Sequence, residues 1–151
     1  MFPESMPDQV TFFGESGCRI SIEVTGYERE DTDNKDDANW LNATIAIEAG
    51  SFSGTFGVAL TTHELIVLHD RLRAVLQSLS GNVVFRTTEE DLSLDFQFSR
   101  RGSVSISGVA QPHRSAAGSL HFRFESDQSC IGIAVRELAA VLRRFPVRPT
   151  A

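Results

Sequence analysis

Long apolar runs are the first thing that this sequence lacks. No window approaches the roughly 18 consecutive apolar residues of a membrane-spanning helix, so we expect no contact with a membrane. Residues 1–9 hold acids and prolines but no basic stretch followed by an apolar one, so we expect no signal peptide. Cys18 and Cys130 are too few for a disulfide framework, and they favour a reduced, cytoplasmic setting.

Basic residues are also scarce. The chain has 14 Lys and Arg against 20 Asp and Glu, which gives a net charge of −6. Nucleic-acid phosphates are bound by clustered Lys and Arg, so this balance argues against a nucleic-acid partner. An acidic surface serves solubility, and it also suits a basic protein partner.

Sequence motifs of catalysis and metal binding are missing as well. There is no Gly-x-Ser-x-Gly, and the glycine-containing segment 50–54 lacks the Gly-Lys-Ser/Thr ending of a phosphate-binding loop. His63 and His69 are six residues apart, which places them on different faces of a helix. An EF-hand counted from Asp31 would need Gly where Asp36 stands. We therefore expect no enzyme activity, no cofactor and no metal.

The 151 residues that are present suit one globular domain. The apolar fraction is 41% and the charged fraction 23%, so a domain spanning 1–151 can bury a core of its own. Phenylalanine occurs eleven times and has no polar group, so most of these rings should lie in that core. We expect residues 1–8 to form a flexible tail and residues 28–37 to form an acidic loop.

Alternation of apolar and polar residues recurs along most of the chain. Cys18, Ile20, Ile22 and Val24 alternate with polar residues, which is typical of a half-buried antiparallel strand. The same pattern predicts further strands, and the whole set is 10–13, 18–25, 41–48, 52–60, 82–87, 92–98, 104–110, 120–125 and 130–133. The fold class is therefore α+β: an antiparallel β-sheet or sheets of about eight to nine strands, curled or two-layered.

Two amphipathic helices should pack on this sheet. The spacing of Thr61 and Glu64 is that of a capping box, and a leucine stripe follows over residues 61–79. A second apolar stripe runs from Val135 to Phe145, where Pro146 ends the helix.

The two strand-to-helix junctions resemble each other. Phe56-Gly57-Val58 precedes His63-Glu64-Leu65, as Ile131-Gly132-Ile133 precedes Arg136-Glu137-Leu138. The pattern indicates either two sheet-plus-helix halves or a chance match of two junctions.

The acidic loop is the first candidate binding site. Glu30, Asp31, Asp33, Asp36 and Asp37 could meet a basic partner, and the plain alternative is a solvated loop. The motif that follows, Asn39, Trp40 and Leu41, is expected to be structural. Trp40 would anchor the start of a strand, with a binding hot spot as the alternative.

The stretch Asp37-Ala38-Asn39-Trp40-Leu41-Asn42, preceded by Gly26-Tyr27 and a polar acidic loop, resembles the entry motif of the WapI-family immunity proteins of bacteria. The helices that begin near Glu64-Leu65 and end at Phe145-Pro146 are similar to theirs. The resemblance implies a cytosolic protein that neutralises a partner toxin by binding it, and it implies no catalytic residues. The long acidic insert before Asp36 and the Phe-rich strands depart from the family pattern.

Two functions from different classes follow. The first is a non-catalytic binding protein, an immunity protein that uses its acidic loop against a basic toxin. The second is a small-ligand carrier or enzyme with a pocket between sheet and helix, which would show an apolar cavity with convergent polar groups.

Overall fold

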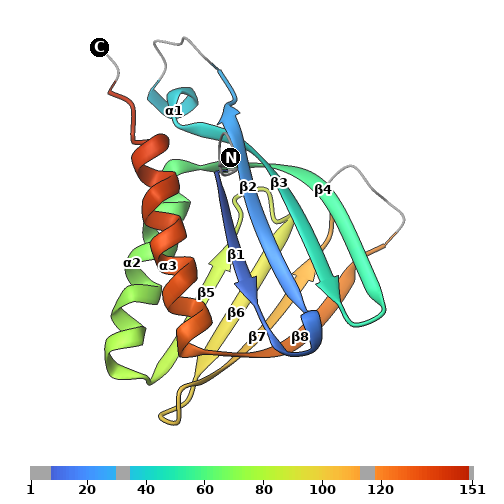
Figure 1. Ribbon diagram of the computed structural model, residues 1–151. Helices are drawn as coiled ribbons and strands as arrows, with labels where there is room; N and C mark the ends of the chain where they lie inside the picture. The colour runs from blue at the N-terminus through green and yellow to red at the C-terminus, as the bar shows by residue number, and fades with distance from the viewer. Residues whose placement is uncertain (1–7, 30–34, 113–117, 150–151) are drawn as a thin grey trace, which may run out of the picture.

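Eight strands form two four-stranded antiparallel sheets in the computed structural model, which describes residues 8–29, 35–112 and 118–149 (Figure 1). The strands of the first sheet are β1 (Gln9–Phe13), β2 (Arg19–Tyr27), β3 (Trp40–Ala49) and β4 (Phe52–Thr61). Those of the second are β5 (Gly81–Arg86), β6 (Leu92–Phe98), β7 (Ser103–Ala110) and β8 (Leu120–Asp127). A 3-10 turn η1 (Glu15–Gly17) and the helices α1 (Lys35–Ala38), α2 (Thr62–Ser78) and α3 (Gln128–Arg144) complete the described elements. The predicted α+β class and the two-layered arrangement are confirmed.

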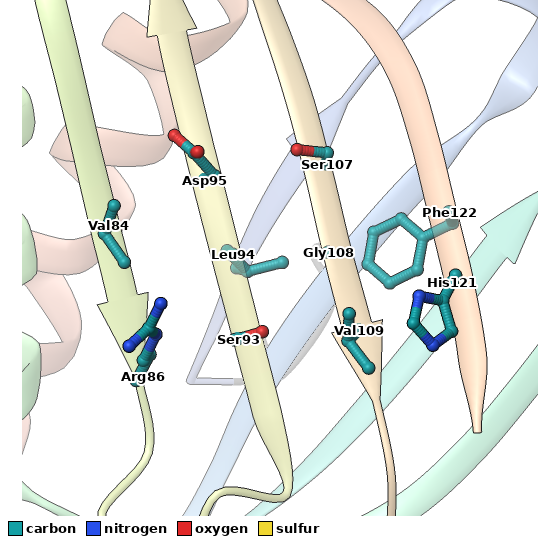
Figure 2. A pocket seen from close by; sticks show the side chains of 10 residues that line it. All are labelled: Val84, Arg86, Ser93, Leu94, Asp95, Ser107, Gly108, Val109, His121 and Phe122. Atoms are coloured by element: carbon teal, nitrogen blue, oxygen red, sulfur yellow. The ribbon is translucent and has the colours of Figure 1, made fainter. Parts of the chain in front are cut away.

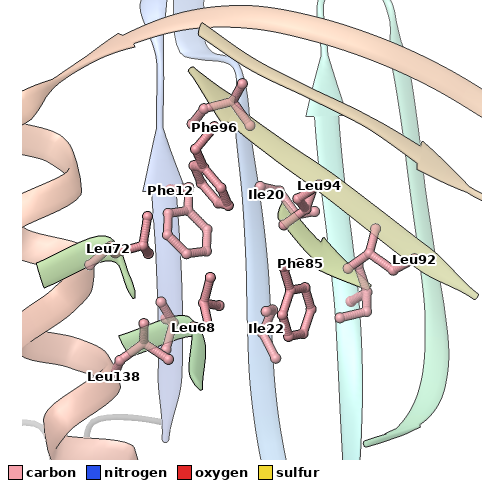
Figure 3. Close-up of a cluster of buried hydrophobic side chains, with 14 of the residues drawn as sticks. Phe12, Ile20, Ile22, Leu68, Leu72, Phe85, Leu92, Leu94, Phe96 and Leu138 are labelled. Carbon is pink, nitrogen blue, oxygen red and sulfur yellow. The ribbon is translucent and has the colours of Figure 1, made fainter. Parts of the chain in front are cut away.

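Period-2 alternation produces the buried faces as the sequence predicts. Ile20 and Ile22 of β2 are fully buried, and they pair in register with the buried Ile47 and Ile45 of β3. Phe12 of β1 and Phe96 of β6 come from opposite sheets, and their ring centroids lie 5.0 Å apart. One apolar cluster therefore joins the two layers (Figure 3). Alternation over the predicted strand 52–60 puts Phe52 on the inward face with Phe56, Val58 and Leu60, but Phe52 is 67% exposed at the start of β4.

Helix α2 begins as predicted, at a complete capping box. The Thr61 hydroxyl accepts from the backbone N–H of Glu64, and the Glu64 carboxylate accepts from the backbone N–H of Thr61. The prediction for residues 130–133 is wrong, because they form the first turns of α3 rather than a last strand. Asp127 ends β8 and caps α3 by accepting from the N–H of Cys130 at 2.9 Å, so the helix starts earlier than the stripe from Val135 indicates.

The two halves of the chain have the same order of elements, four strands and then a helix. The buried helix positions also correspond: Leu65, Leu68 and Leu72 lie four, seven and eleven residues after Thr61, as Ile131, Ala134 and Leu138 do after Asp127. The first helical N–H of each half bonds the carbonyl just before the third strand, Thr62 to Asn39 at 3.0 Å and Gln128 to Gly102 at 2.8 Å. The two-half interpretation is therefore supported. Its proposed alignment is not, because Ile131–Ile133 is helical.

Each helix covers an edge of the other half's sheet. Helix α2 leaves β4 and lies along β5, while α3 leaves β8 and lies along β1, so the two helices pack side by side (Figure 1). Glu137 of α3 accepts from the N–H of Thr11 on β1 at 2.9 Å. Glu64 of α2 accepts from the N–H of Thr88, just after β5, at 2.6 Å. These carboxylates fasten the helices to the opposite halves.

Candidate functional site

The motif at Asn39 holds the C-terminal segment of the chain. The Asn39 side chain accepts from the backbone N–H of Arg148 at 2.7 Å and donates to the Arg148 carbonyl at 3.4 Å. This pair of bonds mimics one rung of a β-ladder, made by an amide side chain. The backbone carbonyl of Asn39 accepts from Thr62, so Asn39 joins β3, α2 and the C-terminal segment.

The guanidinium of Arg148 joins both ends of the acidic loop. Its Nε donates to the carbonyl of Ala38 at 2.8 Å, and its Nη2 donates to the carbonyl of Arg29 at 2.6 Å. Its Cζ also lies 3.7 Å from the centre of the Tyr27 ring, a cation–π contact. Arg148 thus links Arg29, near the start of the loop, to Ala38, which ends α1.

Tyr27 completes this cluster. Its hydroxyl donates to the carbonyl of Pro146, and its ring meets that of Phe145 edge-on with centroids 5.6 Å apart. Burial raises the pKa of the Tyr27 phenol, and the nearby Arg148 cation opposes part of this rise. The phenol therefore remains a hydrogen-bond donor at neutral pH.

The candidate acids fall into two groups. Glu30, Asp31 and Asp33 lie outside the described residues. Asp36 lies in α1, and the partly exposed Asp37 ends 4.0 Å from the Arg29 guanidinium. That ion pair joins the two sides of the loop, so Asp37 contributes to the loop's closure.

Trp40 and Leu41 begin β3 on opposite faces of the sheet. Leu41 is fully buried in the core, whereas Trp40 is only partly buried and pairs with Thr61. The Trp40 carbonyl accepts from the N–H of Glu28 at 2.9 Å, which brings the acidic loop back to β3. We propose that Asn39 and Leu41 act as structural residues, and that Trp40 contributes less to stability than a buried core anchor would.

A second acidic segment faces the first across a hollow of about 780 Å³. Glu28, at the base of the acidic loop, lines it together with Glu89 and Asp91 of the turn between β5 and β6. Residues 42–44 of β3 and 56–59 of β4 supply the floor, where Phe56 is partly buried and Val58 is buried. Sequence reasoning missed Glu89 and Asp91. The signal was present, since Glu89-Glu90-Asp91 are three consecutive acids, but their approach to Glu28 depends on the fold.

The outer face of β5–β8 carries a shallower hollow of about 290 Å³ (Figure 2). Arg86, Asp95 and His121 lie along it on β5, β6 and β8. Asp95 lies opposite Ser107 of β7, which lies opposite Arg123 of β8, so His121 is two strands away from Asp95 and two residues further along. The two side chains are well apart in Figure 2. This face can contact a polar ligand, but it does not set an acid beside a base.

Thiol catalysis and metal binding have little support in the described residues. Burial and the Asp127 carboxylate raise the pKa of the Cys130 thiol, the opposite of what activates a nucleophile. No group of three or more His, Cys, Asp or Glu side chains within 8–29, 35–112 and 118–149 is arranged to hold a metal ion. Over the same residues, no helix is long and apolar enough to cross a membrane.

The fold and this cluster define an α+β protein with two sheet-plus-helix halves. Tyr27 and Asn39 bind residues 145–149, and the Arg148 side chain of this segment binds Ala38 and Arg29; we call this set of contacts the C-terminal clasp. The positions that carry the family resemblance, Gly26-Tyr27, Asp37–Leu41 and Phe145-Pro146, converge at this clasp. Residues 11–146 match the immunity protein WapI-like family, and the chain belongs to that family.

No curated protein matches the chain. A solved structure described as crystal structures of Trypanosoma bruciei MRP1/MRP2 is 13% identical with a TM-score of 0.49, covering 95% of this chain and 86% of that one.

Proposed function

We propose that this chain is a non-catalytic binding protein, an immunity protein that neutralises a partner toxin in the cytoplasm. The observation that carries the proposal is the family match, which spans both halves of the fold. The charge of the chain supports a basic partner, because the net charge is −6 and two acidic segments flank one hollow.

The proposed contact surface has two parts. The first is the acidic loop with Glu30, Asp31, Asp33, Asp36 and Asp37, whose ends are held by the clasp. The second is the exposed Glu89 of the acidic turn, next to the buried Asp91. Charges of one sign on both sides of a hollow attract a basic surface and accelerate its approach, most strongly at low salt.

The test is binding and neutralisation of the toxin encoded beside this chain. One variant neutralises the loop: Glu30→Gln, Asp31→Asn, Asp33→Asn and Asp36→Asn. A matched control neutralises four acids elsewhere, three of them exposed and Glu125 partly so: Glu15→Gln, Glu48→Gln, Asp70→Asn and Glu125→Gln. Both variants change the net charge from −6 to −2, so a loss of binding confined to the loop variant reflects where the charge is removed.

We expect the loop variant to bind about tenfold or more weakly, with a flatter salt dependence, while the control stays within about threefold of wild type. Equal losses in both variants would mean that the loop has no special role. Absence of any binding or protection by the wild-type chain would reject the proposed function.

A further inference from the structure

Strand β4 is a sheet edge that the described elements leave uncovered. It pairs with β3 on one side, and no strand of the described residues pairs with its other side. The corresponding edges of β1 and β5 are covered by α3 and α2. An uncovered edge presents unpaired N–H and C=O groups to any extended chain that approaches.

The sequence of β4 does not protect this edge. Residues Phe52–Thr61 contain no charged residue and no proline, which are the usual means of blocking strand addition. The other uncovered edge strand, β8, carries His121, Arg123 and Glu125. Thr55 and Gly57 are exposed on β4, and Phe52 is 67% exposed.

A groove follows this edge. The acidic hollow of about 780 Å³ lies over residues 56–59 of β4, and a second hollow of about 360 Å³ lies over residues 52–56. Phe56 and Pro112 line both hollows, so the two are neighbours along the strand. Together they form what we call the groove, which borders residues 52–59 of an unprotected edge.

The two ends of the groove differ in chemistry. At one end, Phe52, Phe56 and Leu120 give an apolar lining. At the other end, the exposed Glu28 and Glu89 give an acidic one. An occupant that satisfies both ends is an extended segment with basic residues at one end and an apolar side chain at the other.

We propose that a basic, extended segment of a partner protein binds in this groove as a fifth strand beside β4. Its backbone would pair with the free edge, its basic end would face Glu28 and Glu89, and an apolar side chain would enter the hollow beside Phe52. The assignment of this segment to the toxin rests on the proposed function, whereas the groove itself can be tested with peptides.

A second copy of this chain fits less well. Two antiparallel β4 strands would place the uncharged apolar end of one copy against the acidic end of the other. Because β4 has no Lys or Arg, Glu28 and Glu89 would gain no opposite charge from that strand. Charge therefore selects a basic partner over self-association.

The experiment uses a labelled synthetic peptide of about eight residues, with two lysines at one end, alternating threonine and valine, and a terminal phenylalanine. The reversed sequence tests the opposite strand direction. A third peptide carries N-methyl groups on alternate amides, which remove backbone donors and leave the side chains unchanged. Fluorescence anisotropy measures the affinity of each for the full chain.

Three variants locate the bound peptide. Thr55→Lys places a charge on the exposed edge, and Gln97→Lys is its control on the interior strand β6, with an equal change of charge. Glu28→Gln with Glu89→Gln removes charge from the acidic end. We expect Thr55→Lys, the double variant and N-methylation each to weaken binding about tenfold or more, and Gln97→Lys to change it less than about threefold.

The outcomes separate the two proposals. No saturable binding of either peptide direction, undiminished binding after N-methylation, or equal effects of Thr55→Lys and Gln97→Lys would each overturn strand addition. If the toxin binds Thr55→Lys and the Glu28→Gln, Glu89→Gln variant as tightly as wild type, strand addition is also overturned, while the proposed function survives. Peptide binding with the expected pattern, in a chain that does not bind the toxin, supports the groove and rejects the toxin-neutralising function.

Discussion

Asn39 and Arg148, which are 109 positions apart, form reciprocal hydrogen bonds between the amide side chain of Asn39 and the backbone N–H and C=O of Arg148. The Arg148 side chain then reaches the carbonyls of Ala38 and Arg29. The guanidinium of Arg148 therefore links the C-terminal segment to Arg29 and Ala38. These two residues lie at the two ends of the acidic loop.

Loss of Arg148 should loosen the acidic loop. Arg148→Ala removes hydrogen bonds from a charged donor, so we expect the free energy of unfolding to fall by about 1–3 kcal/mol in urea denaturation. Arg148→Lys should recover only part of this, because an ammonium cannot reproduce the planar fork.

Hydrogen exchange shows whether Arg148 stabilises only the acidic loop or the whole fold. Amides of residues 28–39 should exchange faster in Arg148→Ala, while those of β6 and β7 remain protected. The control is Arg144→Ala, an exposed arginine 3.7 Å from Asp8, with an expected change within about 0.5 kcal/mol. Equal stabilities for Arg148→Ala and Arg144→Ala would contradict the clasp.

The Tyr27 hydroxyl should make stability fall at alkaline pH. Burial raises its pKa above the ordinary value near 10, so the folded state favours the protonated phenol. The stabilisation is complete below the pKa of the unfolded chain and is lost as pH rises through the pKa of the folded chain.

Absorbance reports this titration directly, since Tyr27 is the one tyrosine of the sequence. The folded protein should ionise above the midpoint of the urea-unfolded chain. The Tyr27→Phe variant should lose less stability at alkaline pH than the wild type, because it has no phenol at this position to ionise. A folded midpoint at or below the unfolded one would refute the assignment.

Glu64 should contribute more to stability than an ordinary surface carboxylate. It caps α2 through Thr61 and also accepts from the N–H and hydroxyl of Thr88, at 2.6 and 2.9 Å. We expect Glu64→Ala to lower the free energy of unfolding by about 1–3 kcal/mol, because it removes a cap and a link to the other half.

Glu64→Gln is the matched variant for this prediction. It keeps one oxygen acceptor and should recover part of the loss. Glu90→Ala, at an exposed turn, should change stability by no more than about 0.5 kcal/mol. A loss for Glu64→Ala as small as that for Glu90→Ala would show that the bridge is ineffective.

Gly108 should not tolerate a side chain. A Cβ there would lie 2.6 Å from Cζ of Phe122 and 2.7 Å from the carbonyl oxygen of Ser93, and the latter is backbone that cannot move aside. We expect Gly108→Ala to destabilise the chain by about 1–3 kcal/mol in urea denaturation. Gly57→Ala is the control, since the nearest atom there is 3.9 Å away; its stability should match or exceed wild type.

The alternating pattern predicted most of the fold because each strand has one buried face. Ile20, Ile22, Ile45 and Ile47 show the relation directly, as their periodicity and their burial agree. Residues 130–133 misled the prediction because an apolar Ile-Gly-Ile run is compatible with strand and helix, and the cap at Asp127 decided between them. Phe52 was misplaced because alternation alone does not show where a strand extends beyond the core.

The candidate site was predictable only in part. The acids of the loop are local in sequence, but Arg148 is an isolated residue near the C-terminus and nothing beside it indicates its partners. Its role follows from where α3 ends, next to Tyr27 and Asn39. The groove likewise depends on which strand of the sheet remains at the edge, and strand order is a property of the assembled fold.

The crossed placement of the helices has a consequence for how the chain folds. Neither ββββα half can cover the free edge of its own first strand, because the helix that covers that edge belongs to the other half. A chain cut between Leu79 and Gly81 should therefore give fragments that are unstructured alone and regain structure when mixed. A single polypeptide of this design behaves as an obligate dimer of two tethered subunits.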